Sequence, residues 1–502
     1  MGSIIPLKIN FIMMKLTVHR KDTILYPDNR KVIGRFFYLG DERARKLIAR
    51  ILAMNEEEVR LLLGQILREF TTRHRSITTI LMRHYQKVAH LVQELNQNEM
   101  VSEYRRLLIG CYFTMEYAIE SAALFNPSVV EDPDQTNLEE GQKRVIISLR
   151  ATGEGHISSL VFRRAIIDRN NDIILQEPGF LVDEPEVVRD HKYQKKRFVS
   201  KLMEMEVPAE IYSLVLDQLP EEFTYDQIRE CTLSLINGNS QLPLNKRVAV
   251  EEILWLADSY TRIRFSLDTD LSERVIFPIS RYEKNGIEDA RFVKFTDDNG
   301  ETVYYATYTA YDGFTILPKL IETEDFCTFR IFPLHGKYAI DKNLALFPRK
   351  IGGKYAMVSR IDGQNNYIMF SKNLYRWSHA ELLQEPAYPW EFVQVGNAGS
   401  PIETPQGWLL ITHGVGPMRK YCLGASLLDL ENPGKVIGRL KEPLLLPAEN
   451  ERTGYVPNVV YSCGAIVHNE ELIIPYAMSD YASAFASVNL NDLLGEILRS
   501  KV

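Results

Sequence analysis

The chain has 502 residues, of which 45% are hydrophobic and 25% charged, and its formal net charge is −7. These proportions are ordinary for a soluble globular protein and exclude a disordered, collagen-like or coiled-coil chain. Lysines, arginines and acids are mixed along most of the sequence, so no basic region indicates a nucleic acid or an anionic membrane as partner.

The five cysteines are scattered and none belongs to a C-x-x-C pair, which argues against a disulfide framework or a structural zinc site. The apolar stretch at residues 4–14 is broken by Pro6, Lys8 and Asn10, and no later stretch reaches the ~20 apolar residues that a membrane span needs. We therefore expect a cytoplasmic protein in a reducing compartment, without a membrane span.

Residues 1–121 are predicted to form a mostly helical N-terminal extension. Asn55 and Glu58 have the spacing of a capping box. Apolar residues then recur at helical spacing in three stripes: Val59, Leu62, Leu63, Ile66, Leu67 and Phe70; Ile77, Ile80, Leu81, Tyr85, Val88 and Val92; and Tyr104, Leu107, Leu108, Cys111 and Met115. These stripes indicate helices that either pack against one another or join copies of the chain into a homo-oligomer.

Strand-like alternation begins at residues 144–149 and 157–162, and a helical insertion is predicted at about 190–260. From Arg262 onward, short alternating strands are separated by turn residues. The first hairpin joins Phe292–Phe295 to Val303–Tyr308 through Asp297–Gly300. The same pattern of two short strands joined by a turn recurs around Gly352–Gly353, Gln406–Gly407 and Asn469–Glu470.

A repeat of roughly 50 to 60 residues with up to four strands is typical of propeller blades. Four such repeats follow Arg262, and one precedes the insertion. We therefore predict a mainly β fold, a five-bladed β-propeller over residues 122–495, with the helical insertion after its first blade. Residues from all blades would then meet at one central funnel.

The segment Asn285–Arg291 places two adjacent acids, Glu288 and Asp289, before an arginine at the start of a predicted inner strand. Taken alone, this pattern is usual for a solvated turn with a local ion pair. Strand alternation predicts that the two carboxylates point to opposite sides, so that only one faces the funnel.

The segment Gly286–Arg291 resembles the G-x-E-D-P-R motif of glycoside hydrolase family 130, the mannoside phosphorylases and β-mannosidases. Further segments resemble the family's pattern in the correct order: Leu124–Ser128, Asp341–Pro348, Gly407–Val415, Gly424–Asp429, Gly454–Val460 and Asp480. The resemblance covers residues 124–491 without the insertion. It implies that Asp289 is the catalytic proton donor.

The resemblance also implies two groups of binding residues. Mannose next to the cleaved bond would be held by Asn126, Ser128, Arg150 and Asp480. Phosphate would be held by Lys342, Asn343, Arg360, His413 and Tyr455. The sequence departs from the family's pattern at Gln394, where the phosphorylases usually have lysine, at Ala290 for proline and at Ser359 for histidine. Neither a metal nor a cofactor is expected.

Inverting cleavage of a glycoside needs an acid for the leaving oxygen and a nucleophile on the opposite face of the sugar. The favoured hypothesis is a phosphorylase. It would cleave β-manno-oligosaccharides or a mannosyl disaccharide with inorganic phosphate and give mannose 1-phosphate. One alternative is an inverting β-mannosidase, which needs a second carboxylate, with Glu391, Glu403 and Glu449 as candidates. Another is a non-catalytic carbohydrate-binding propeller. Linkage and acceptor sugar depend on loops at the funnel mouth and are left open.

Overall fold

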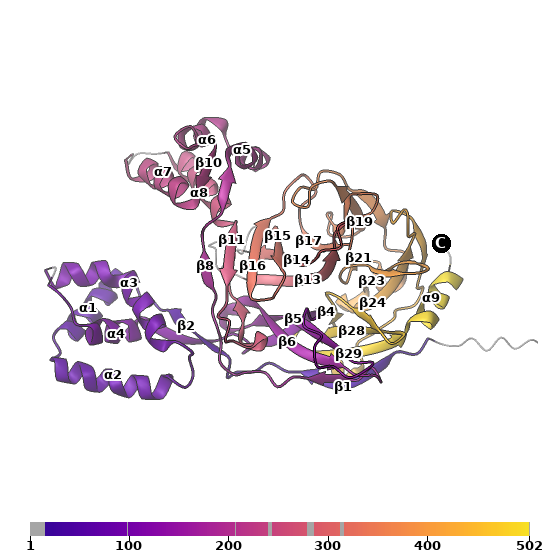
Figure 1. The fold of residues 1–502 in the computed structure, drawn as a ribbon, viewed down its shortest axis with the longest axis horizontal. Helices are drawn as coiled ribbons and strands as arrows, with labels where there is room; N and C mark the ends of the chain where they lie inside the picture. The colour runs from indigo at the N-terminus through magenta and orange to yellow at the C-terminus, as the bar shows by residue number, and fades with distance from the viewer. Residues whose placement is uncertain are drawn as a thin grey trace, which may run out of the picture.

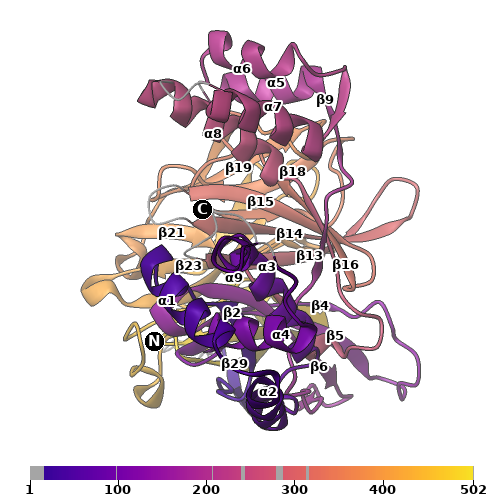
Figure 2. The ribbon, with the colours of Figure 1, turned by 90° about the vertical axis from the view of Figure 1, so that its left-hand side faces the viewer.

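The computed structural model describes residues 16–97, 99–205, 207–238, 243–278, 286–311 and 316–500. The fold is mainly β, and two groups of helices stand apart from the sheets in Figure 1 and from each other in both views (Figures 1 and 2). The N-terminal group consists of α1 (Asp41–Leu52), α2 (Glu56–Phe70), α3 (Ile77–Leu95) and α4 (Glu103–Tyr112). The second group consists of α5 (Lys195–Glu204), α6 (Ala209–Leu216), α7 (Tyr225–Gly238) and α8 (Leu244–Asp258).

Two antiparallel meanders lie side by side in the first part of the β region. One has the order β4 (Ala123–Glu131), β5 (Lys143–Thr152), β6 (Ser158–Ile167) and β7 (Ile173–Leu175), with β12 (Val275–Ile276) also on β6. The other has the order β13 (Gly286–Thr296), β14 (Thr302–Tyr311), β15 (Ile316–Thr323) and β16 (Thr328–Pro333), extended by β11 (Thr261–Arg264) and β8 (Glu186–Val188). They join where Gly286 pairs in parallel with Ser158.

Three further meanders follow in chain order. The first is β17 (Lys342–Leu346), β18 (Tyr355–Arg360), β19 (Asn366–Ser371) and β20 (Glu381–Gln384). The second is β21 (Gln394–Asn397), β23 (Gly407–Val415), β24 (Tyr421–Leu428) and β25 (Val436–Arg439), with β22 (Ile402–Thr404) on β23. The third contains β26 (Val460–Tyr461), β28 (Glu471–Met478) and β29 (Ala482–Asn489), with β27 (Ile466–His468) on β28, and α9 (Leu490–Arg499) follows it.

The last sheet takes its outer strand from the other end of the chain. Strand β1 (His19–Leu25) pairs antiparallel with β29, and His19 lies opposite Ser487. The stretch 1–121 therefore contains a strand of the last sheet, and a separate two-stranded ribbon of β2 (Val32–Phe36) and β3 (Thr114–Ala118), besides its helices. The boundary at residue 121 stays a prediction.

The helices expected from the apolar stripes are present, and the stripes pack within the chain. At the start of α2, the Asn55 side chain accepts from the Glu58 amide at 2.9 Å, and the Glu58 carboxylate accepts from the Asn55 amide at 2.9 Å. This is the expected capping box. Leu63, Leu81 and Leu108 are buried together in the core shared by α1–α4.

The second helical group has an apolar core of its own, to which β9 (Lys192–Gln194) and β10 (Glu222–Thr224) add a short ribbon. Strands β8 and β11, which pair with each other, connect this group to the sheets. Within the described residues, no helix combines the length and apolar character needed to cross a bilayer.

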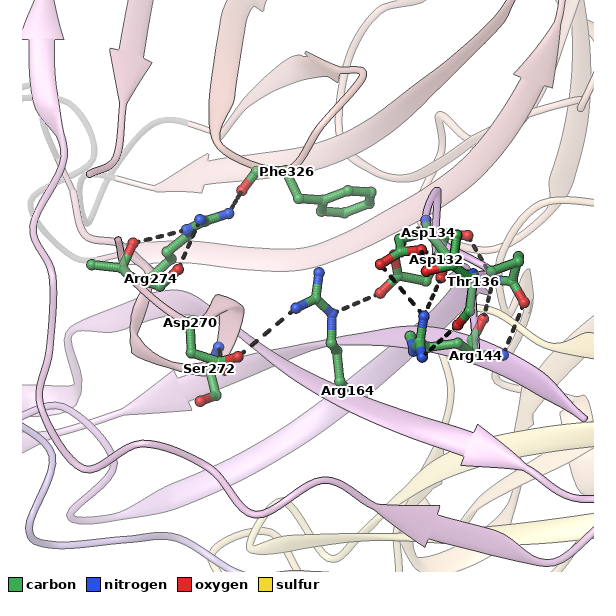
Figure 3. A network of polar contacts seen from close by, with 11 residues as sticks. Asp132, Asp134, Thr136, Arg144, Arg164, Asp270, Ser272, Arg274 and Phe326 are labelled. Carbon is green, nitrogen blue, oxygen red and sulfur yellow. Dashed lines mark hydrogen bonds and ion pairs between the residues drawn. The ribbon is translucent and has the colours of Figure 1, made fainter. Parts of the chain in front are cut away.

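Charged side chains form ion pairs and hydrogen bonds that connect the loops around the first two meanders (Figure 3). Arg164 of β6 lies between Asp132, at 2.7 Å, and Asp270, at 3.8 Å. Arg274 donates to the carbonyl oxygen of Phe326 at 2.9 Å. Because each arginine bridges segments distant in sequence, these contacts hold β6 and the strands after the insertion in one arrangement.

Candidate active site

A cavity of about 200 Å³ is lined by residues from the first strand of each of the five meanders, β4, β13, β17, β21 and β26. Eight of the residues predicted for the site line it: Asn126, Arg150, Asp289, Lys342, Asn343, Arg360, His413 and Asp480. The lining also includes Gln394, Arg419, Tyr421, Val456, Val459 and Tyr461. Residues more than 350 positions apart in the sequence therefore share one polar cavity.

Three of the first strands carry an irregularity at a site residue. Asn126, Asp289 and Asn343 have φ angles of 50°, 54° and 66°, and each lies where the pairing register of its strand shifts. Asparagine and aspartate enter this left-handed region more readily than other residues with a Cβ. A bulge re-aims a side chain, which accounts for all three reaching the cavity.

Only Asp289 of the two acids lines this cavity, as predicted, whereas Glu288 lines a neighbouring one. A bulge, rather than strict alternation, sets the directions of the two side chains. Both carboxylates contact Arg150, Glu288 at 2.7 Å and Asp289 at 3.5 Å. Glu288 is 7% exposed and also accepts from the Lys342 ammonium at 2.7 Å. It belongs to the charge network of the site even though it lines a neighbouring cavity.

Asp289 is buried among cations. Asn126 donates to its Oδ1 at 2.7 Å, and the Arg291 guanidinium donates to its main-chain carbonyl at 3.0 Å. Burial alone would raise the pKa of this carboxyl. The charges of the nearby basic residues and the bond from Asn126 outweigh burial, and the pKa lies below its usual value. In this arrangement Asp289 is ionised at neutral pH.

Asp480 behaves in the opposite way. Burial raises its pKa to about 6; Arg150 and Arg419 oppose the shift, whereas the negative charge of Asp289 adds to it. The residue has a φ angle of 52° in the turn after β28. The cavity thus has two carboxyl groups whose pKa values move apart, a pattern typical of sites that transfer protons.

The side of the cavity that is predicted to bind phosphate includes Arg360 and His413. The Nδ1 of His413 lies 3.0 Å from the carbonyl oxygen of Asn397, and its Nε2 lies 3.5 Å from the Arg360 guanidinium. Because only a protonated Nδ1 can bond to a carbonyl, Nε2 of the neutral ring accepts from Arg360. Burial, aided by the charges of Arg360 and Arg291, lowers the pKa of His413 well below its usual value. Donation from His413 to phosphate stays a prediction, and it requires a proton on Nε2.

Two predicted residues lie outside this cavity. Ser128 is buried, and its hydroxyl accepts from the Phe292 amide at 3.1 Å, so it links β4 to β13. Tyr455 is 60% exposed and packs against His156, with 5.0 Å between ring centroids, beside the neighbouring cavity. Their binding roles stay predictions.

Several residues that shape the site have no role that was predicted from the sequence. Arg291 donates to the Tyr461 hydroxyl at 2.7 Å, and Asn343 donates to the same oxygen at 3.2 Å. Arg291 ends the quoted motif, and Tyr461 directly follows the quoted segment Gly454–Val460, so a signal was present for both. Arg419 comes from the short helical turn Pro417–Arg419, where the sequence has no comparable signal.

The three acids considered as the second carboxylate of a hydrolase are elsewhere. Glu391 is fully buried against Arg439 at 2.6 Å, Glu403 pairs with Arg349 at 2.7 Å on the surface, and Glu449 is exposed. None of the three lines the cavity around Asp289.

Comparisons with known proteins agree with the motif. The family model described as beta-1,4-mannooligosaccharide phosphorylase, glycoside hydrolase family 130, matches residues 245–499. This chain belongs to family 130. It is 36% identical over 238 residues to a 1,2-beta-oligomannan phosphorylase of Thermoanaerobacter sp., covering 44% of this chain and 75% of that protein. It is 32% identical over 254 residues to a beta-1,2-mannobiose phosphorylase of Listeria innocua, covering 48% of this chain and 69% of that protein.

Among solved structures, a beta-1,2-mannobiose phosphorylase of Listeria innocua aligns with 75% of this chain and 92% of its own, at 22% identity and a TM-score of 0.45. The family membership confirms the resemblance drawn from the motifs and identifies the chain as an enzyme. The matched region begins in α8, and β4–β6 with Asn126 and Arg150 precede it.

Proposed function

We propose that this enzyme is an inverting phosphorylase that cleaves β-mannosides with inorganic phosphate and releases mannose 1-phosphate. The observation that carries the proposal is one cavity that combines Asp289 with Lys342 and Arg360, while the alternative hydrolytic acids lie elsewhere. Arg360 can grip phosphate through two parallel hydrogen bonds. Its Nε is buried and has no hydrogen-bond partner among the described residues, so it has a donor to offer.

We also infer that the five meanders are the blades of a five-bladed β-propeller. The first strands would be the innermost, because all five contribute to one cavity. The catalytic domain would span 122–495, interrupted by the insertion at about 190–260, and β1 would complete the last blade. Residues 1–121 would otherwise be an extension.

In the proposed reaction, Asp289 gives its proton to the leaving oxygen as the bond from this oxygen to the mannose anomeric carbon breaks. A phosphate oxygen forms the new bond to that carbon from the opposite face, with inversion. Asp289 must therefore be protonated before the step, although its surroundings favour the anion. Phosphate bound beside Lys342 would offset the cations and raise the pKa of Asp289. Phosphate would thus both attack and prepare the acid.

The other residues would hold the two substrates. Asn126 and Arg150 lie beside Asp289, and Asp480 lines the same cavity, so these three are placed to bind mannose hydroxyls. Ser128 would contribute to the mannose side indirectly, by holding β4 against β13. Asn343, His413 and Tyr455 would complete the phosphate side. The reaction uses phosphate as its co-substrate and draws on no metal or cofactor.

The test is incubation with β-1,2- and β-1,4-linked manno-oligosaccharides, with and without phosphate, while mannose and mannose 1-phosphate are measured. We expect mannose 1-phosphate only when phosphate is present. Arg360→Ala should weaken the use of phosphate by ~2 to 5 kcal/mol, because it removes a desolvated charge-assisted contact. Arg349→Ala is the matched control, since it removes a guanidinium that pairs with Glu403 on the surface.

Gln394 lines the cavity as a neutral side chain, so Gln394→Lys should strengthen phosphate binding. Release of free mannose at one rate with or without phosphate would show a hydrolase instead. In that case Asp480, the other carboxyl group in the lining, becomes the candidate for activating water.

A further inference from the structure

A second cavity, of about 350 Å³, lies where the helical insertion meets the β region. Its lining comes from β9 and α5 on one side, and from the end of β16 and the segment between β19 and β20 on the other. It shares no lining residue with the cavity around Asp289. This volume is within the range of small-molecule sites.

Aromatic rings form a continuous wall of this cavity. His191 stacks on Tyr260 with 4.9 Å between centroids and 10° between planes, and Tyr193 meets Tyr260 edge-on at 5.5 Å. The wall crosses to the β region through Phe332, which is 6.3 Å from Tyr260 and 5.0 Å from Tyr375. Such a wall favours a ligand with a flat ring.

Three cations lie among the remaining lining residues, beside the neutral Gln194, Ser200 and Asn373. Lys192, Arg197 and Arg376 contribute positive charge, and no aspartate or glutamate belongs to the lining. Arg376 pairs with Glu204 at 3.3 Å, whereas Lys192 and Arg197 form no ion pair with any described residue. Two uncompensated cations beside an aromatic wall, in a chain of net charge −7, favour an anionic ligand.

A buried polar atom also lacks a partner in this cavity. The Nδ1 of His335 has no hydrogen-bond partner among the described residues. The main chain of His335 is held on both sides, because its amide donates to Tyr375 at 2.9 Å and its carbonyl accepts from Trp377 at 2.7 Å. Burial lowers the pKa of His335 to about 4, so the ring is neutral. A polar group of a ligand would relieve the cost of this unpaired atom.

We propose that this cavity binds a nucleoside monophosphate, with the base against the wall of Tyr260 and Phe332 and the phosphate held by Arg197 and Lys192. The aromatic wall accounts for the planar base, the two unpaired cations account for the phosphate, and His335 offers a hydrogen bond to a base or ribose atom. The ligand would bridge the insertion and the third meander. The proposal is independent of the mannoside reaction, because it uses none of the residues around Asp289.

The test is isothermal titration calorimetry of the full chain with adenosine 5′-monophosphate. We expect saturable binding that weakens about tenfold or more in Arg197→Gln, the usual scale for losing a hydrogen bond to a charged group. Lys196→Gln is the matched control, since Lys196 is the exposed neighbour on the same helix and does not line the cavity. Adenosine, which lacks the phosphate, should bind more weakly by a similar factor.

Mannose 1-phosphate and inorganic phosphate should not displace the nucleotide, and Arg360→Ala should bind it normally. Arg197 is exposed, so its substitution should leave thermal unfolding unchanged. The proposal is overturned if adenosine 5′-monophosphate does not bind, or if Lys196→Gln weakens it as much as Arg197→Gln. It is equally overturned if Arg360→Ala abolishes binding, because the nucleotide would then occupy the phosphorylase cavity.

Discussion

The core of the helical bundle α1–α4 and the lining of the cavity around Asp289 both contain buried side chains, but different interactions hold these side chains in place. In the bundle, Leu63 and Val88 pack among other apolar side chains, and helical periodicity is enough to place them. In the cavity, charges depend on specific partners from other meanders, as Arg150 of β5 depends on Glu288 of β13. An apolar core tolerates the exchange of one apolar side chain for another of similar size. A buried charge, in contrast, needs a particular partner of opposite charge. Substitutions should therefore act mainly on stability in the first region and mainly on chemistry in the second.

The strongest expected effect breaks the chemistry and leaves the fold. Asp289→Asn keeps the shape of the side chain and its bond from Asn126 but removes the transferable proton. We expect turnover to fall by about 10² to 10⁴, with a normal circular dichroism spectrum. Asp298→Asn, a surface change at the far end of the same hairpin, should retain activity. Near-normal turnover of Asp289→Asn would remove this residue from the role of proton donor.

The bundle should respond in the opposite way. Leu63→Asp buries a charge in the core of α2 and should lower the free energy of unfolding by about 2 to 5 kcal/mol in urea titrations. Leu61→Asp, on the same helix at a position 64% exposed, should change it by about 0.5 kcal/mol or less. Gel filtration distinguishes the other possibility: a folded Leu63→Asp protein that elutes as a smaller species would show that α2 is a subunit interface.

These two regions also differ in what the sequence alone can predict. The capping box at Asn55 and the stripes of α2–α4 depend on neighbours within a few residues, so periodicity identified them. Motif resemblance indicated which residues belong to the site, but it did not predict how their side chains are arranged. The contact of both Glu288 and Asp289 with Arg150 was not predicted, because the bulge at Asp289 depends on pairing between β13 and β14. Arg419 was missed because a left-handed turn residue carries no sequence pattern that indicates a cavity.

A change at Glu288 tests whether the ion pairs around the cavity contribute to catalysis, because Glu288 does not itself line the cavity around Asp289. Glu288→Gln weakens the contacts to Arg150 and Lys342, each at 2.7 Å. We expect a loss of about 1.5 to 3 kcal/mol in transition-state stabilisation, measured as kcat/KM. Glu301→Gln, exposed on the same hairpin, is the control. Equal kinetics for the two variants would mean that the ion pairs of Glu288 do not position Lys342 for catalysis.

The smallest expected effect is a gain in stability. The pKa of Asp480 is about 6 in the folded protein, above the ~3.9 of an unfolded chain. The folded state therefore binds the additional proton, and its stability falls as the pH rises from about 4 to 6. Asp480→Asn removes this dependence and should stabilise the protein at pH 7 by about 1 to 3 kcal/mol. The gain should be absent at pH 4. Urea titrations at both pH values measure it, and destabilisation of equal size at both would contradict the assignment.

The pairing of β1 with β29 sets a limit on the order of events during synthesis. His19 is made 468 residues before its partner Ser487. At ~5 to 20 residues per second, β1 waits on the order of twenty to ninety seconds for the strand that it pairs with. The last sheet therefore stays incomplete until β29 has emerged, after the strands of the four earlier sheets. During that time the edge of β1 has no partner from its own sheet, so the chain must keep this strand from pairing elsewhere.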